Sequence, residues 1–214
     1  AQAQSDEFKG KDAYERAALT SFHVVGGTSV LTPKGSVYLV PTPHVYFKKD
    51  NDLLGKVKYH RLIPSPKGYS LNNSSTISII PASGQGVKRV RVPSTVHAIT
   101  KHKGQNLIYL ISVDQPSSLF ALDPQTFEVI AWLRRPAEDE KYLFSGHAVE
   151  IPGTDFIAVG MTGLEKGKHD HISIRHARTL KVEQRFSTFG FEVHEVALSP
   201  DGKTFACAHY GSYM

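Results

Sequence analysis

The chain has 214 residues, with 25 Lys and Arg against 20 Asp and Glu, a formal net charge of +5. Hydrophobic residues make up 40% and charged residues 21%, which is typical of a globular chain and excludes a largely disordered one. No apolar run is long enough to span a bilayer, so the sequence predicts no transmembrane segment. Its single cysteine, Cys207, excludes a disulfide framework and a multi-cysteine metal site.

The first residues are small and polar. Ala1-Gln2-Ala3-Gln4 is the kind of start that remains after a secretory signal is removed, so we expect an exported protein, periplasmic or secreted. The alternative is a fragment boundary. Residues 1–27 are interpreted as an N-terminal extension, with a short helix expected around residues 13–19.

Strand patterns dominate the rest of the chain. An early group of expected strands covers Ser36–Val40, Thr76–Ile80 and Val87–Val92, and a Pro-rich loop is expected from residue 41 to 73. Later strands are clearer, being rich in β-branched and aromatic residues between Gly, Pro, Asp and Ser turns. They are Asn106–Val113, Leu119–Leu122, Phe127–Leu133, Phe156–Met161, Ile172–Arg175, Val182–Phe186, Val193–Leu198 and Thr204–Ala208.

A repeat of about fifty residues organises these strands. Three segments, which begin at Val96, Gly146 and Val193, each contain a histidine, an apolar strand, a turn ending in glycine and a more hydrophobic strand. The turn glycines lie at 104, 153 and 202, so both intervals are 49 residues (153 − 104 and 202 − 153). Four strands at this period are typical of a propeller blade.

The predicted fold is therefore all-β, a β-propeller of the seven-bladed type with about three and a half four-stranded blades in this chain. The predicted units are a diverged blade with a long insertion (28–93), two regular blades (94–135 and 146–187) and the first half of a further blade (193–214). A propeller suppresses its sheet edges by closing into a ring. We therefore expect the remainder of the propeller, a second copy or another chain to complete it, and interpret this chain as an N-terminal portion of a longer protein or as one such partner.

The run from Leu119 to Tyr213 resembles a family of exported bacterial seven-bladed propellers of unknown function, often encoded beside imelysin-type periplasmic iron-uptake proteins. Residues 142–147 (YLFSGH) look like its F-x-G-H blade opening. Residues 186–195 (FSTFGFEVHE) are similar to its F-x-S-x-G-I-G-P-H-E stretch, and SPDGK follows at 199–203. The resemblance implies a propeller fold, a periplasmic protein partner and a link to iron acquisition.

The chain departs from that family at three places. Val193 stands where the family usually has Pro, residues 209–211 (HYG) replace an Asn-Gly-Gly-like stretch, and residues 162–165 (TGLE) replace an acidic segment. These departures concern a shared ligand site rather than the blade architecture. The segment from Ser199 to Ser212 also resembles lactonase-type seven-bladed propellers, although Ser-Pro-Asp-Gly is chiefly turn chemistry.

Three histidines, His97, His147 and His194, occupy equivalent repeat positions near the first strand of consecutive blades. The first strand of a blade is innermost, so these imidazoles are expected to converge at the mouth of the central channel. They are candidate ligands of a transition metal ion (copper, iron or zinc) or of another ligand. Glu195 is a candidate orienting or ligating carboxylate. The structural alternative is that each histidine binds a neighbouring blade's backbone and locks adjacent blades together.

Other histidines carry weaker hypotheses. His209 alternates with Cys207 on an expected strand, so it is a candidate ligand or, with Cys207, a nucleophile–base pair; a buried structural Cys is the alternative. His169 and His171 are two residues apart and form a candidate surface chelate. Lys101-His102-Lys103 is expected to be exposed charge at a turn.

No G-x-S-x-G, Walker A, G-x-G-x-x-G or H-E-x-x-H motif is present, and no catalytic residue can be named. The basic strand at 88–92 lacks interleaved aromatics, so no nucleic-acid partner is expected. The predicted function is an exported, non-enzymatic propeller that binds a ligand or partner at the channel mouth. The alternative is an enzyme at the same place, a lactonase-like hydrolase or a His-ligated metal oxidoreductase, and a hydrolase needs a carboxylate or Arg beside the histidines.

Overall fold

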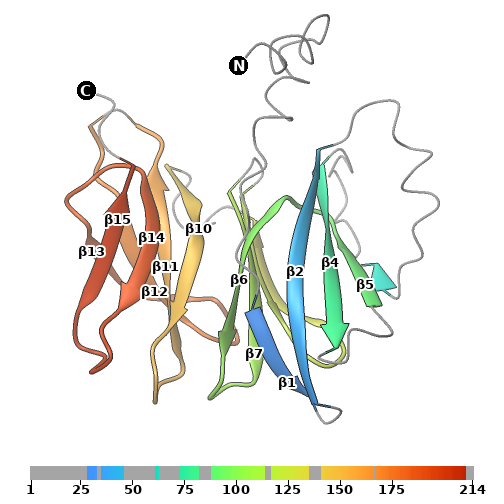
Figure 1. The fold of residues 1–214 in the computed structure, drawn as a ribbon. Coiled ribbons are helices and arrows are strands. Elements are labelled where there is room, and N and C mark those ends of the chain that lie inside the picture. Colours follow the sequence, from blue (N-terminus) through green and yellow to red (C-terminus); the bar gives the residue numbers. More distant parts are fainter. Residues whose placement is uncertain are drawn as a thin grey trace, which may run out of the picture.

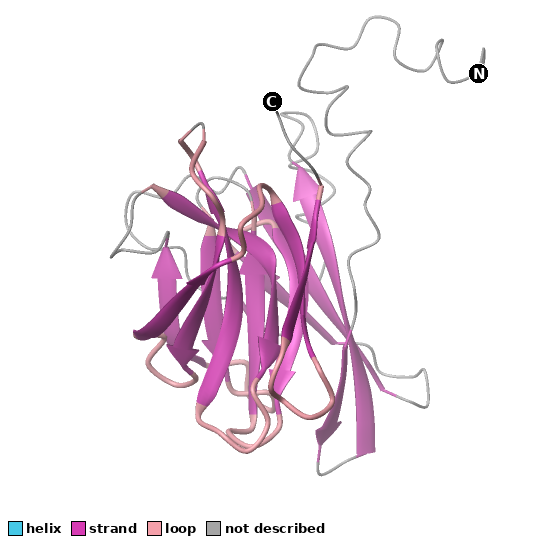
Figure 2. Ribbon diagram, turned by 90° about the vertical axis from the view of Figure 1, so that its left-hand side faces the viewer, coloured by secondary structure: helices cyan, strands magenta, loops and turns pink. Residues whose placement is uncertain are grey.

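The computed structural model of the chain describes residues 28–32, 35–45, 61–62, 73–81, 88–113, 117–134, 141–165 and 167–210. It forms a row of antiparallel sheets (Figure 1), and every regular element in these ranges is a strand (Figure 2). The helix expected around residues 13–19 lies outside the described residues. Within those residues, no helix is long and apolar enough to cross a membrane.

The first sheet has five strands in the order β1-β2-β4-β5-β3. The strands are β1 (Thr28–Thr32), β2 (Gly35–Val45), β3 (Arg61–Leu62), β4 (Asn73–Pro81) and β5 (Lys88–Val92).

The loop expected from residue 41 to 73 was wrong at its start, because β2 continues through Pro41 and Pro43 to Val45. Strand β1 pairs with β2 as far as Leu39, so among the described strands the later residues of β2 have a neighbour on one side. Proline, which has no N–H to donate, is tolerated on such an edge. The same expected loop also supplies β3, which pairs with β5 in parallel.

The following sheets are antiparallel meanders, each in simple chain order. The second sheet contains β6 (Val96–His102), β7 (Leu107–Ser112), β8 (Ser118–Leu122) and β9 (Val129–Arg134); the third contains β10 (Tyr142–Glu150), β11 (Phe156–Gly163), β12 (His171–His176) and β13 (Val182–Ser187). A two-stranded sheet follows, with β14 (Val193–Leu198) and β15 (Phe205–His209). Each of these three sheets thus begins with the strand that carries one of the three repeat histidines.

The first strands form the inner side of the row. Strand β6 packs against β10 and β10 against β14, and Figure 1 shows the sheets following one another across the molecule in chain order. Apolar side chains fill the space between neighbouring sheets. Ile99 and Phe120 belong to the layer between the first and second sheets, Tyr109 and Met161 to the layer between the second and third, and Val196 to the layer between the third and the two-stranded sheet. Burial of these faces against one another is the main stabilising term of such an arrangement.

Hydrogen bonds also join the sheets. The Val96 N–H donates to Ser75 Oγ (2.8 Å) between the first and second sheets, and Thr100 Oγ1 donates to the Ala148 carbonyl (2.8 Å) between the second and third. These bonds fix the position of β6 relative to both neighbours. The histidine at the start of β6 is therefore held in a defined place with respect to β10.

Candidate functional site: three histidines on three neighbouring strands

The three repeat histidines share one local backbone device. The register of β6 with β7 shifts between Val96 and Ala98, that of β10 with β11 between Phe144 and Ala148, and that of β14 with β15 between Val193 and Glu195. Each histidine lies within its shift, which is a one-residue β-bulge at His97 and His194 and a longer irregularity at His147. Bulges leave a residue unpaired and re-aim its side chain. The repeat therefore supplies both the histidine and the irregularity that turns it inward.

The structure brings His97, His147 and His194 together. Their candidate ligand nitrogens all lie within 4.8 Å of one another. His97 Nε2 is 3.1 Å from His147 Nε2, and the ring centroids of His147 and His194 are 4.8 Å apart. All three side chains are half-buried. Among the described residues this is the one group of histidine, cysteine and acidic side chains close enough to hold a metal ion.

Glu195 orients the His147 ring. Its Oε2 lies 3.0 Å from His147 Nδ1, so a neutral His147 ring donates Nδ1–H to the carboxylate and keeps a lone pair on Nε2. Burial, and then the neighbouring His194, lower the pKa of His147 to about 4. The carboxylate favours the charged ring, but it is 49% exposed and its influence is screened by solvent, so burial dominates. His147 is therefore neutral at pH 7, and its Nε2 lone pair accepts the hydrogen bond from His97 Nε2.

Gly146 makes room for this arrangement. It has a φ of 103°, and a Cβ there would lie 2.5 Å from Val113 Cγ1 and 2.6 Å from His97 Cδ2. A side chain at this position would thus collide with one of the three histidines. On the other side of the cluster, the Tyr210 ring packs at 4.3 Å from the His194 ring.

The structure places His209 outside this cluster. Its Nδ1 lies 3.1 Å from the Phe191 carbonyl, to which the ring can donate, and it pairs with Val193 across the β14–β15 ladder. Cys207 lies on the same strand and packs partly buried against the apolar layer of β11, β12 and β14. Burial raises the pKa of the Cys207 thiol, which disfavours a nucleophilic thiolate.

Two further histidine expectations need correction. His102 was expected to be exposed at a turn, but it is 1% exposed, and its Nε2 lies 3.1 Å from the Phe156 carbonyl of the next sheet. The rings of His169 and His171 do not form a chelate: His169 packs at 4.9 Å from Phe191, whereas His171 packs at 4.2 Å from Tyr142. His169 precedes β12, so alternation along a strand does not apply to it.

Sequence reasoning missed Glu150. This carboxylate accepts hydrogen bonds from the backbone N–H groups of Lys103 (3.0 Å) and Gly104 (3.3 Å), and it lies 3.3 Å from His102 Nδ1. It therefore ties the turn after β6 to the end of β10. No single-residue pattern signals this pair, because its two members are 48 residues apart (150 − 102) and belong to different sheets.

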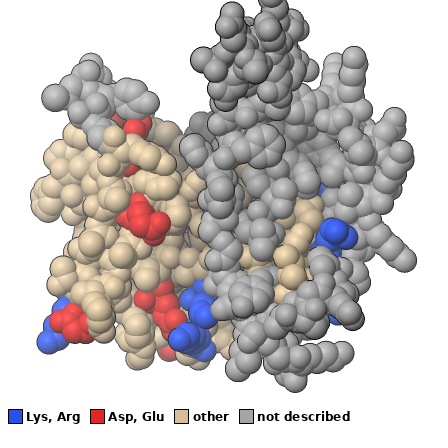
Figure 3. Space-filling model, in the orientation of Figure 1, with Lys and Arg blue, Asp and Glu red and all other residues tan. Residues whose placement is uncertain are grey.

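Charged side chains on the face drawn in Figure 3 form small separate groups of both signs over its described part. No continuous basic field covers the described residues on that face. Side-chain exposure is greatest in the strands farthest from the histidines, as in β13, where five of the six residues are exposed.

Comparisons with known proteins identify the architecture. No protein-family model matches the chain, and no curated protein matches it. Among solved structures, hydrazine synthase of Kuenenia stuttgartiensis matches with a TM-score of 0.52 and 18% identity, over 64% of this chain and 37% of that one. A chain of the mitotic checkpoint complex matches with a TM-score of 0.50 and 15% identity, over 64% of this chain and 42% of that one. The WD40 repeats of RRP9 match with a TM-score of 0.46 and 12% identity, over 66% of this chain and 46% of that one.

The fold is a β-propeller. Four-stranded antiparallel meanders packed side by side through their first strands are its blades, and the likenesses at these identities concern the fold alone. The aligned part of this chain spans less than half the length of each of these structures. The three histidines thus lie on the first strands of consecutive blades.

Proposed function

We propose that this chain belongs to a binding propeller whose channel mouth holds a transition metal ion on His97, His147 and His194. The observation that carries the proposal is the convergence of three imidazole nitrogens within 4.8 Å, from three different blades. Zinc–imidazole bonds of about 2.0–2.1 Å place the nitrogens of a tetrahedral site about 3.3 Å apart. The His97–His147 pair is already at 3.1 Å through an Nε2–Nε2 hydrogen bond, so binding requires that the metal ion replace the shared proton and that His194 move closer.

The donor set favours particular metals. Three neutral imidazoles suit zinc, copper and ferrous iron, whereas hard ions such as magnesium and calcium prefer oxygen. Three protein ligands leave a coordination position for water or another molecule, as in open zinc sites. Glu195 accepts the Nδ1–H of His147, the outer contact that commonly fixes a ligating histidine.

An exported location and a link to iron acquisition come from the family resemblance, and we retain both as parts of the proposal. Iron would then be handled as the ferrous ion, which accepts imidazole ligands. Strand β15 pairs with β14 alone among the described strands, which supports completion of the ring by the remainder of the propeller, by a second copy or by another chain. Light scattering identifies a second copy, which doubles the molar mass.

The enzyme alternative is supported by one contact. Glu195 places a carboxylate beside the mouth histidines, 3.0 Å from His147, which is the group that a hydrolase at this site requires. A lactonase assay with the metal-loaded protein tests this alternative. Hydrolysis that is lost in Glu195→Gln, with the metal still bound, would favour the enzyme over the binding protein.

Calorimetric titration of the dialysed protein with zinc, copper and ferrous iron tests the binding function. We expect one ion per chain for at least one of these metals. Removal of a residue that hydrogen-bonds to a metal ligand commonly lowers metal affinity up to about 100-fold, and removal of the ligand itself lowers it further. We therefore expect more than about 100-fold weaker binding in each of the variants His97→Ala, His147→Ala and His194→Ala. His176→Ala, outside the cluster, is the matched control and should bind as the parent does. The absence of saturable binding of all three metals, or equal losses in the control, would contradict the proposal.

A further inference from the structure

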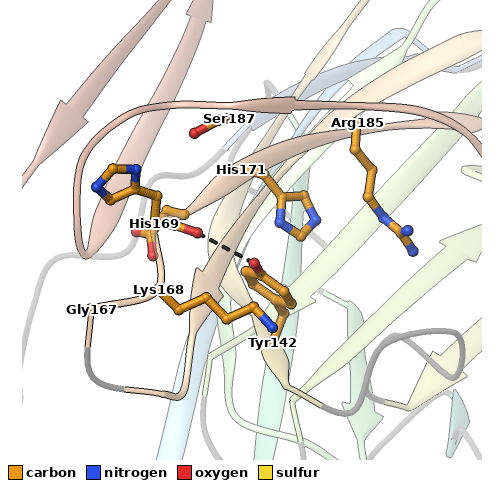
Figure 4. A pocket seen from close by; sticks show the side chains of 8 residues that line it. Tyr142, Gly167, Lys168, His169, His171, Arg185 and Ser187 are labelled. Atoms are coloured by element: carbon orange, nitrogen blue, oxygen red, sulfur yellow. Dashed lines mark hydrogen bonds between the residues drawn. The ribbon is translucent and has the colours of Figure 1, made fainter.

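A hollow lies on the third blade, lined by none of the three repeat histidines. It measures about 440 Å³ and opens between the start of β10, the turn before β12 and the outer strand β13. Its lining is mainly polar: Tyr142, Gly167, Lys168, His169, Asp170, His171, Arg185 and Ser187 (Figure 4). This volume is that of a small-molecule site.

The wall of the hollow is organised around the Tyr142 ring. The His171 ring packs against it edge-on at 4.2 Å, and the Lys168 ammonium lies 4.8 Å from the ring centroid. Tyr142 is 8% exposed and His171 is 7% exposed, so this part of the wall is buried. The aromatic ring thus holds an ammonium and an imidazole at one side of the hollow.

Arg185 faces them from the neighbouring strand. The β12–β13 register pairs His171 with Ser187 and Ser173 with Arg185, so His171, Arg185 and Ser187 share one face of the sheet. Figure 4 shows the guanidinium of Arg185 beside the His171 ring and the Lys168 side chain reaching toward Tyr142.

The lining acid, Asp170, is already committed to the backbone. Its carboxylate accepts hydrogen bonds from the N–H groups of Gly163 (2.9 Å) and Val193. Its own N–H donates to the Gly190 carbonyl (3.0 Å), and the Thr188 N–H donates to the Asp170 carbonyl (2.9 Å). These bonds hold the turn next to Lys168 in place. Because both carboxylate oxygens of Asp170 accept backbone N–H groups, the other charged side chains on the wall of the hollow are cationic.

We propose that this hollow binds a small organic molecule through an oxyanion, a carboxylate or a phosphate. The groups on its wall that can donate to such an anion are the Lys168 ammonium, which also lies 3.7 Å from Glu165 Oε2, the Arg185 guanidinium and the His171 imidazole. The Tyr142 hydroxyl already donates to the His169 carbonyl (3.4 Å), and Arg185 can present two parallel N–H groups to the anion. The turn is held before any ligand arrives, so little ordering accompanies binding. This site shares no residue with the metal site proposed at His97, His147 and His194.

The test uses two probes, inorganic phosphate and succinate, added to isotope-labelled protein that has been freed of metal with EDTA. Two-dimensional amide spectra should show saturable shifts for residues 167–171 with at least one probe, and sodium chloride at equal ionic strength should not reproduce them. Arg185→Gln should weaken binding about tenfold or more, since it removes a charged hydrogen-bonding partner. Lys168→Gln should weaken binding in the same direction.

The matched control is Lys203→Gln, which removes an exposed cation on the fourth sheet. We expect it to bind both probes as the parent protein does. Shifts with phosphate alone identify a phosphate site and shifts with succinate alone a carboxylate site, and either supports the proposal. Shifts that do not saturate with either probe, or equal weakening in Lys203→Gln and Arg185→Gln, would overturn it.

Discussion

Two histidine–carboxylate pairs bridge neighbouring blades, and they differ in what the histidine touches. In the three-histidine cluster, His147 contacts Glu195 of the next blade, and its Nε2 lies 3.1 Å from His97 Nε2. At the far end of β6, His102 contacts Glu150 of the next blade, but its Nε2 faces the Phe156 carbonyl. In the first pair the second nitrogen meets another imidazole, which can itself ligate a metal ion, whereas in the second it meets a backbone carbonyl. The same residue types thus serve as a candidate site in one place and as a fastening between blades in the other.

The largest expected contrast is in stability. His102→Ala empties a fully buried side-chain position and removes one of the two donors to the Phe156 carbonyl, which also accepts from the Ile151 N–H. It should therefore lower the free energy of unfolding of metal-free protein by about 2–4 kcal/mol, mainly through the cavity. His97→Ala, which truncates a half-buried side chain, should cost less than about 1 kcal/mol. Urea denaturation measures both, and His102→Gln, which keeps a donor, should recover part of the loss. Equal losses of unfolding free energy in His102→Ala and His97→Ala would contradict the different roles given to these two histidines.

Two glycines with positive φ provide a second comparison between the histidine cluster and the opposite end of the blades. A Cβ on Gly146 at the mouth (φ 103°) would lie within 2.6 Å of Val113 and His97, whereas a Cβ on Gly153 in the far turn (φ 75°) would have nothing within 4 Å. Gly146→Ala should therefore lower the free energy of unfolding by about 2–3 kcal/mol and weaken zinc binding, and Gly153→Ala should cost about 1 kcal/mol with zinc binding unchanged. Thermal denaturation and zinc titration measure these effects. Unchanged zinc affinity in Gly146→Ala would contradict the role given to its contact with His97.

The two carboxylates provide a smaller, reciprocal test. Glu195→Gln removes the outer partner of His147 and should weaken zinc binding about tenfold, with little change in stability. Glu150→Gln weakens the acceptor of two backbone N–H groups, so it should cost about 1 kcal/mol of stability and leave zinc affinity unchanged. Titration calorimetry and urea denaturation on both variants check the pattern. Weaker zinc binding in Glu150→Gln together with lower stability in Glu195→Gln would contradict the roles given to the two carboxylates.

The smallest effect concerns Cys207. Because burial raises the pKa of its thiol, the reactive thiolate forms only as the pH rises above the ordinary value for cysteine. Alkylation at pH 7 should therefore be several-fold slower than in the urea-unfolded protein, and it should accelerate at higher pH. Fast alkylation at neutral pH would instead indicate a histidine-activated nucleophile.

The sequence predicted the strands well wherever apolar alternation and turn residues agree, as at Val193–Leu198, which the structure reproduces residue for residue. It also singled out His97, His147 and His194, because a repeat places equivalent residues at equivalent points of successive blades. It did not predict β2 through Pro41 and Pro43, since tolerance of proline depends on where the neighbouring strand ends.

Other features of the site required coordinates. The bulges at the three histidines are differences in strand register, which side-chain periodicity does not record. The burial of His102 depends on a carbonyl in another blade, 54 residues away. The hollow beside Tyr142 depends on the register of β12 with β13 and on the hydrogen bonds that fix Asp170. Each of these is a long-range relation that no local pattern encodes.

The central claim is that three imidazoles from three blades bind one metal ion. X-ray absorption spectroscopy of the zinc-loaded protein tests this claim most directly, because outer-shell scattering from imidazole rings reports the number of histidine ligands. We expect three imidazole nitrogens at about 2.0 Å with one further light-atom ligand. A zinc shell made of oxygen ligands, or one with fewer than two histidines, would contradict the account.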